Sequence, residues 1–265
     1  MQQTWVILGA TSAMARAFAR LLAEEGQALI LAGRDMDDLE RLAADCALRG
    51  AAEARAMRFD TRAPRHDAAI LDALEASEGT LNAAVFVGAM PPQAEIDADP
   101  ARLAGVIEDN FTGPARLLHR LAPMIEARGR GTVVGVGSVA GDRGRLGNYV
   151  YGAGKAAFDT YLSGLRNRLG RAGGHVVTVK PGFVDSAMTW GIEGMFLVAP
   201  PARVARDIRR AVARARNTIY TPGFCPLIMP PPRPRAFDGT KQRQLCRTAS
   251  PKQQRPAEQR PEPLV

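Results

Sequence analysis

The chain has 265 residues, of which 46% are hydrophobic and 23% are charged, values typical of a soluble globular protein with one large domain. No apolar run reaches the roughly 18 residues of a membrane span, and the start MQQTWVILGATS lacks the basic region of a signal peptide. The three cysteines and three histidines have no metal-ligand spacing. We therefore expect a cytoplasmic protein without a metal site.

The formal net charge of +8 raises the question of nucleic acid or an anionic membrane as a partner. However, residues 230–265 carry +5 of this charge and the rest of the chain only +3. This Pro/Arg/Gln-rich end has no periodicity and few large apolar side chains, so we expect a disordered tail after a domain of residues 1–229. The composition changes abruptly after the run GFCPLIM, which suggests a frameshifted or divergent end. Nucleic-acid binding is not favoured.

Short apolar runs alternate with helical patterns along the domain. Strands are predicted at 4–8, 28–32, 53–59, 81–87, 131–137, 175–180 and 218–221. Helices are predicted at 12–25, 36–49, 65–76, 100–128, 148–171 and 201–216. Continuous apolar runs are typical of strands buried on both faces. The alternation therefore predicts a single α/β domain with a Rossmann-like, doubly wound parallel sheet of about seven strands and helices on both faces.

The segment ILGATSAMAR joins the first strand to the first helix. Gly9 can take turn dihedrals that other residues avoid, and free N–H groups at the start of the helix favour a phosphate. Ala13 and Ala15 stand where a dinucleotide fingerprint has two more glycines. A nucleotide-binding turn and a plain strand–helix turn capped by Ser12 both remain open. The candidate cofactor contacts here are Gly9, Thr11, Ser12, Ala13 and Met14.

The second strand ends in ILAGRD, where nicotinamide-binding folds meet the adenosine ribose. An acidic residue there suits a free 2′-hydroxyl, whereas an arginine suits a 2′-phosphate. Arg34 therefore favours NADP(H) over NAD(H), although Asp35 beside it weakens the argument. Asp60, at the end of the third strand, is a candidate for contacting the adenine, or else a turn former.

Tyr151 and Lys155 lie four residues apart, so they share one face of a helix that starts near Asn148. An ammonium beside a phenol lowers the phenol's pKa, which would let Tyr151 exchange protons near neutral pH. Tyr149 has no such partner and is expected to pack or to line the rim of a pocket. Ser138 follows the fifth strand, at the edge where such sheets bind ligands. These residues predict a carbonyl-binding, proton-transferring site.

In this combination the chain resembles the short-chain dehydrogenase/reductase family. The resemblance rests on Gly9, Asn110, Ser138 and the Tyr151–Lys155 pair, and it covers residues 4 to 222. It implies that Tyr151 is the general acid or base and that Lys155 lowers the Tyr151 pKa and binds the nicotinamide ribose. It also implies that Ser138 orients the carbonyl, and that Asn110 holds a water that links Lys155 to solvent.

The segment KPGFVDSAM resembles the family's Pro-Gly segment near the nicotinamide, which adds Pro181, Gly182, Val184 and Ser186 as cofactor contacts. The chain also departs from the family pattern. Besides Ala13 and Ala15, the family's Asn-Asn-Ala-Gly segment appears as VFVG, which keeps only Gly88, a further candidate contact. The asparagines that support this turn are missing, so we expect it to be held in another way.

AGDRGRLGNYVYGAGKA and KPGFV are similar to a bacterial branch of the family that includes decaprenylphosphoryl-2-keto-ribose reductases. This similarity implies reduction of a keto sugar, which could be lipid-linked, and leaves a peripheral membrane location open. Arg143 and Arg145 are either contacts to a substrate phosphate or a solvated loop. The family resemblance also implies a homodimer or homotetramer. A broad ketone or 3-oxoacyl reductase and a non-catalytic nucleotide sensor remain alternatives.

Overall fold

Seven parallel strands form one sheet in the computed structural model, which describes residues 3–189 and 198–223. Their order across the sheet is β3-β2-β1-β4-β5-β6-β7, so the connections reverse direction between β1 and β4. This arrangement confirms the predicted doubly wound α/β fold. The predicted strand ends agree with the structure within two residues. The strands are β1 (Gln3–Leu8), β2 (Ala28–Gly33), β3 (Glu53–Arg58), β4 (Thr80–Val85), β5 (Gly131–Val136), β6 (Gly174–Pro181) and β7 (Thr218–Thr221).

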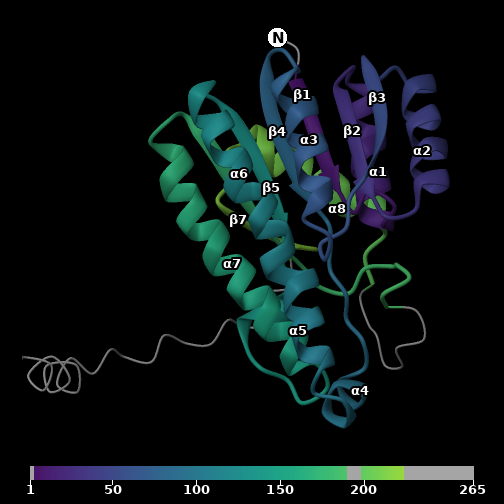
Figure 1. Cartoon of the computed structure of the whole chain (residues 1–265), viewed down its shortest axis with the longest axis vertical. Coiled ribbons are helices and arrows are strands. Elements are labelled where there is room, and N and C mark those ends of the chain that lie inside the picture. The colour runs from purple at the N-terminus through teal and green to yellow at the C-terminus, as the bar shows by residue number, and fades with distance from the viewer. Residues whose placement is uncertain (1–2, 190–197, 224–265) are drawn as a thin grey trace, which may run out of the picture. The chain divides into compact units, whose positions relative to one another are not determined.

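Helices cover both faces of the sheet (Figure 1). One face carries α1 (Ala13–Glu24), α2 (Met36–Leu48) and α8 (Pro201–Ala213). The other carries α3 (Arg65–Glu75), α6 (Gly113–Ala127) and α7 (Tyr149–Gly170). Two short helices, α4 (Gln93–Ala98) and α5 (Arg102–Ile107), lie beyond the sheet on the side opposite the N-terminus. They extend the edge at which the parallel strands end.

The strand β1 shows why the sheet strands read as unbroken apolar runs. Trp5 and Ile7 face the cluster formed with α1 and α8, whereas Val6 and Leu8 face the cluster formed with α6 and α7. All four side chains are at most 2% exposed. Alternate side chains of a strand point to opposite faces, so both faces of β1 must be apolar.

The single helix predicted at 100–128 is divided in the structure. Between α5 and α6, residues 108–112 form a π-helical turn in which the Gly113 N–H bonds to the Glu108 carbonyl. Pro114 follows directly and has no N–H to continue an α-helical pattern. The wider turn carries Asn110, which is 1% exposed. The sequence pattern also missed α4, and the helix predicted at 201–216 ends at Ala213.

The predicted tail of residues 230–265 and the frameshift hypothesis lie outside the described residues. Among the described residues, no helix is long and apolar enough to cross a membrane. In the same part of the chain, no group of three or more His, Cys, Asp or Glu side chains is placed to hold a metal ion.

Candidate active site

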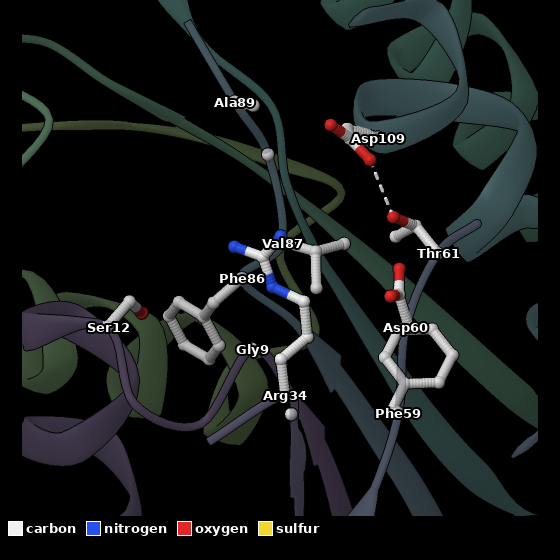
Figure 2. Close-up of a pocket in the computed structure, with 12 residues that line it drawn as sticks. Gly9, Ser12, Arg34, Phe59, Asp60, Thr61, Phe86, Val87, Ala89 and Asp109 are labelled. Atoms are coloured by element: carbon white, nitrogen blue, oxygen red, sulfur yellow. Dashed lines mark hydrogen bonds between the residues drawn. The ribbon is translucent and has the colours of Figure 1, made fainter. Parts of the chain in front are cut away.

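A cavity of about 150 Å³ opens at the carboxyl ends of the central strands, where the strand order reverses. Ligands of doubly wound sheets bind at this position. Figure 2 shows side chains from four successive strand ends converging on it. The lining residues are Gly9, Ser12, Gly33, Arg34, Phe59, Asp60, Thr61, Phe86, Val87, Gly88, Ala89 and Asp109.

The turn after β1 forms one wall of the cavity. Gly9 has a φ of +75°, and a Cβ on it would lie 3.0 Å from the backbone nitrogen of Val87, so only glycine fits there. The Ser12 Oγ accepts a hydrogen bond from the Ala15 N–H at 3.3 Å and so caps α1. Ala15, in place of a glycine, is completely buried. Of the five predicted contacts in this turn, Gly9 and Ser12 line the cavity, whereas Thr11, Ala13 and Met14 are not among its lining residues.

Arg34 and Asp35 follow β2 and have different roles. The Asp35 carboxylate accepts a hydrogen bond from the Asp38 N–H at 3.1 Å and caps α2. Arg34 is exposed and lines the cavity, and its guanidinium reaches toward Val87 in Figure 2. No described residue forms an ion pair with Arg34. The Asp35 carboxylate is therefore engaged in capping α2, and the Arg34 guanidinium remains available for an anion.

The end of β3 contributes a cluster that the sequence did not reveal. Asp60 lines the cavity and accepts from the Arg62 N–H at 3.0 Å, so it is also a turn former. Beside it, the Thr61 hydroxyl donates to Asp109 Oδ1 at 2.7 Å, as Figure 2 shows, and Arg62 Nη2 donates to Asp109 Oδ2 at 2.6 Å. No local signal connects residues 61 and 109, because the contact depends on how the π-helical turn packs.

Lys155, from α7, is 3% exposed and supports the neighbouring backbone. Its Nζ donates to the Val87 carbonyl at 3.2 Å and to the Val136 carbonyl at 3.1 Å. Burial lowers the pKa of Lys155 to about 8, and the charge of Asp159 acts in the opposite direction. The ammonium therefore lies close to its titration point near neutral pH.

Tyr151 lies one turn before Lys155 and is 7% exposed. The Lys155 Nζ lies 5.9 Å from the centre of the Tyr151 ring. Burial raises the Tyr151 pKa, although a hydrogen bond with the Ser138 side chain lowers it. The sequence led us to expect a pKa lowered by Lys155, but in the structure desolvation of the phenolate outweighs every opposing effect. Tyr149, by contrast, is 46% exposed and donates to Asp97 Oδ1 at 2.5 Å.

Asn110 holds the turn that lacks the family's asparagines. Its Nδ2 donates to the Ala89 carbonyl at 2.7 Å and to the Val106 carbonyl at 2.9 Å. A Cβ on Gly88 would lie 2.7 Å from Asn110 Oδ1 and 3.0 Å from Lys155 Nζ. The two side chains thus converge on Gly88 and support the turn. Oδ1 of Asn110 is buried and has no hydrogen-bond partner among the described residues.

Ser138 begins a short 3-10 turn after β5 and is half-buried. Its Oγ accepts from the Ala140 N–H at 3.0 Å, which fixes the side chain beside Tyr151. In the loop that follows, Arg145 donates to the Val139 carbonyl at 3.2 Å, while Arg143 is exposed. Of these two arginines, Arg143 is placed to meet an anion without first giving up the hydrogen bond that Arg145 makes to Val139.

The predicted Pro-Gly segment follows β6. The Gly182 N–H donates to the Thr221 carbonyl at 3.0 Å, and Pro181 is buried. Val184 is 3% exposed and pairs with Ala199, and its carbonyl accepts a hydrogen bond from the Thr189 hydroxyl at 2.6 Å. The Ser186 N–H donates to the Thr189 hydroxyl at 3.3 Å. None of the four predicted contacts, Pro181, Gly182, Val184 and Ser186, is among the lining residues of the cavity.

The family model described as short chain dehydrogenase matches residues 3–195. The chain belongs to the short-chain dehydrogenase family. An uncharacterised oxidoreductase of Mycobacterium tuberculosis is 33% identical over 218 residues, which cover 82% of this chain and 87% of that protein. A sulfoacetaldehyde reductase of Chromohalobacter salexigens is 33% identical over 190 residues, which cover 69% of this chain and 73% of that protein.

Solved structures agree with this membership. A short-chain dehydrogenase/reductase family protein has a TM-score of 0.72 at 27% identity and covers 83% of this chain and 94% of its own. An actinorhodin polyketide ketoreductase with NADPH has a TM-score of 0.74 at 21% identity, and the match covers 84% of this chain and 97% of that one. At this identity the likeness shows only that the two chains share a fold. As a short-chain dehydrogenase, the protein is an oxidoreductase.

Proposed function

We propose that the protein reduces a ketone to an alcohol with NADPH and that Tyr151 is the proton donor. One observation carries the proposal: Asn110 and Lys155 converge on Gly88, and Gly88 lines the same cavity as Arg34. Asn110 and Lys155, which are suited to proton transfer, thus lie against the wall of the cavity that Arg34 also lines. A cavity without these buried polar groups would support binding alone.

The cavity fits an NADP(H) molecule chemically. Gly9, on which a Cβ would lie 3.0 Å from the Val87 nitrogen, gives the cavity a wall of bare backbone, and the start of α1 beside Ser12 favours phosphate. Arg34 offers an unpaired guanidinium where a 2′-phosphate is expected, and Asp60 lies at the same end. When bound, the nicotinamide supplies the hydride. We expect the nicotinamide to be contacted by Pro181, Gly182, Val184 and Ser186.

The protonated state of Tyr151 suits a proton donor. Burial raises the Tyr151 pKa, so the phenol keeps its proton at neutral pH. A protonated phenol is the form that donates to the oxygen of a carbonyl as negative charge develops on it. Ser138, already hydrogen-bonded beside Tyr151, would donate to the same oxygen and orient it.

Lys155 and Asn110 would return a proton to Tyr151. With a pKa of about 8, the Lys155 ammonium can lose its proton near neutral pH. The unpaired, buried Oδ1 of Asn110 is an acceptor on the path from Lys155 toward Ala89 and the cavity. A water held there would complete a relay to solvent, as the family resemblance implies.

For the substrate we propose a keto sugar, with a lipid-linked form as the more specific version. The support is the likeness of the loop after Ser138 to the keto-ribose reductase branch. In this loop the exposed Arg143 is suited to a phosphate, and Leu146, which is 92% exposed, is suited to an apolar group. We further propose a cytoplasmic homodimer or homotetramer. A broad ketone or 3-oxoacyl reductase is the second candidate. The chain is also similar to a sulfoacetaldehyde reductase, whose named substrate is not a sugar.

The test is NADPH oxidation with a panel of keto sugars, quinones and 3-oxoacyl esters, repeated with NADH. We expect turnover of at least one keto sugar, faster with NADPH. The variant Tyr151→Phe should bind NADPH as wild type does and lose turnover. Equal rates in wild type and variant would overturn the mechanism. Tight NADPH binding without turnover of any carbonyl would favour a nucleotide sensor instead.

A further inference from the structure

A buried group of charged side chains lies behind the proposed catalytic residues, on α7, β6 and the turn after Ser138. Lys180 Nζ lies 3.0 Å from Asp159 Oδ2 and 2.5 Å from Asp142 Oδ1. The three side chains are only 12–15% exposed. Tyr220, on β7, donates its hydroxyl to Asp142 Oδ2 at 3.2 Å. Removing three charges from water costs free energy that their mutual attraction often does not fully offset, so we asked what this group does.

The Asp159 carboxylate lies between the two glycines that flank the Ser138 turn. A Cβ on Gly137 would lie 2.1 Å from Asp159 Oδ1, and a Cβ on Gly141 would lie 3.2 Å from Oδ2. Gly137 is therefore required by the carboxylate, whereas Gly141 is required first by the backbone of α7 at Lys155 and Ala156 and then by the carboxylate. Asp159 also lies one helical turn after Lys155, on the same face of α7. The carboxylate thus contacts the turn that carries Ser138 and shares a helix face with Lys155.

We propose that Asp159 is a positioning residue of the active site: it fixes the Ser138 turn against α7 and stabilises the ammonium form of Lys155. Lys180 Nζ, 3.0 Å from Asp159 Oδ2, holds the carboxylate in place. This inference rests on the proposed function, since it assigns a role relative to Ser138, Tyr151 and Lys155. It adds a residue to the site that the sequence motifs did not include.

The electrostatics agree with this geometry. The charge of Asp159 raises the pKa of Lys155 and also that of Tyr151. The charged groups that act on Asp159 itself are Lys180 from β6, Lys155 from its own helix, and Asp142 from the turn. Burial nevertheless raises the Asp159 pKa, and the two lysines lower it. Asp142, although equally buried, is not among the groups that shift the Lys155 pKa.

The experiment is a ¹³C NMR titration of lysine side chains in the full chain without cofactor or substrate. The sequence has only four lysines, Lys155, Lys180, Lys241 and Lys252, so four signals can be assigned by substitution. In Asp159→Asn, which keeps the shape between the glycines, we expect the Lys155 pKa to fall by about one unit. Asp142→Asn is the matched control and should leave the Lys155 pKa within about 0.3 units of wild type.

An unchanged Lys155 pKa in Asp159→Asn, or an equal fall in Asp142→Asn, would overturn the proposal. Folding of each variant is checked by circular dichroism. If Asp159→Asn does not fold, Asp159→Ser removes the same charge from a smaller side chain and takes its place. A merely structural role of Asp159 would change the melting temperature without selectively moving one lysine signal.

Activity provides a second and separable readout. Reduction needs protonated Tyr151, so removing the Asp159 charge should move the basic limb of the kcat/KM profile to lower pH by about one unit. The probe is whichever keto sugar wild type reduces fastest with NADPH. If wild type reduces nothing, the proposed function fails while the NMR result still stands. If wild type is active but neither the limb nor the Lys155 signal moves, only the role of Asp159 fails.

Discussion

The two ends of the cavity are built in different ways. At the end near Arg34, Arg34 is exposed and Ser12 and Asp60 are half-buried, and Ser12 and Asp35 cap α1 and α2. At the end near Gly88, Asn110 and Lys155 are at most 3% exposed, and their side chains bind backbone carbonyls of α5, β5 and the turn after β4. Binding at the first end depends on local turns, whereas chemistry at the second depends on the packed core.

The chain departs from the family pattern at both ends. Alanines replace two glycines at the open end, and the turn stays intact because Ser12 still caps α1. At the buried end the family's two asparagines are replaced, and the turn instead uses the side chains of Asn110 and Lys155. Substitutions at the buried end should therefore affect activity more strongly than substitutions at the open end.

The largest effect is expected from Gly88→Ala. Its new Cβ would lie 2.7 Å from Asn110 Oδ1 and 3.0 Å from Lys155 Nζ, so both groups must move. A displacement of this size costs about 100-fold in kcat/KM, and the crowding costs about 1–3 kcal/mol of stability. Steady-state kinetics and thermal unfolding measure both. Gly144→Ala is the control, since nothing lies within 4 Å of its Cβ; similar losses in the two variants would contradict the account.

The next effect is a pH dependence of stability caused by Lys155. Its folded pKa of about 8 lies below the roughly 10.4 of an unfolded lysine. Between these values only the unfolded chain holds the proton, so raising the pH from 8 toward 10 should increase the free energy of unfolding by up to about 1.4 kcal/mol per pH unit. Chemical denaturation at several pH values measures the slope. Lys155→Met should abolish it, and a slope that persists in the variant would point to another group.

A smaller effect, on cofactor binding, is expected at the end of the cavity near Arg34. Arg34→Ala should raise the KM for NADPH about 10- to 100-fold by removing a charged hydrogen bond, and leave the KM for NADH nearly unchanged. Cofactor kinetics at saturating carbonyl measure both values. Arg143→Ala, an exposed arginine outside the cavity lining, should leave both unchanged. Equal losses for NADPH and NADH in Arg34→Ala would exclude recognition of the 2′-phosphate.

The smallest effect is expected from the cap of α1. Ser12→Ala removes the acceptor for the Ala15 N–H and should cost about 1 kcal/mol of stability, whereas Ser12→Gly should cost only a few tenths. Urea unfolding of the two variants compares them. An Ala variant as stable as wild type would show that Ser12 is not needed to cap the helix.

The sequence predicted the fold, because the fold follows local patterns, and the same kind of pattern points to the candidate residues. The apolar runs and the Tyr151–Lys155 spacing are visible within a few residues. The π-helical turn was not predictable from periodicity, since it results from packing around Asn110 and Gly113. The contacts of Asp159 with Gly137 and Lys180 were also missed, because they join residues that are distant in sequence.

The direction of the Tyr151 pKa shift was predicted incorrectly for a related reason. The i to i+4 spacing shows that Lys155 is near, but it does not show how deeply Tyr151 is buried. In the structure the burial dominates and the pKa is raised. Desolvation depends on all the surrounding elements, so it can be judged only once the fold is known.

The central claim is that chemistry depends on Tyr151 and not on the neighbouring Tyr149. The direct test compares kcat/KM for NADPH-dependent ketone reduction in Tyr151→Phe and Tyr149→Phe. Tyr151 is 7% exposed beside Ser138, whereas Tyr149 is 46% exposed and bonded to Asp97. We expect a fall of about 10²- to 10⁴-fold in Tyr151→Phe and less than about threefold in Tyr149→Phe. Equal activity of the two variants, or a greater loss in Tyr149→Phe, would contradict the account.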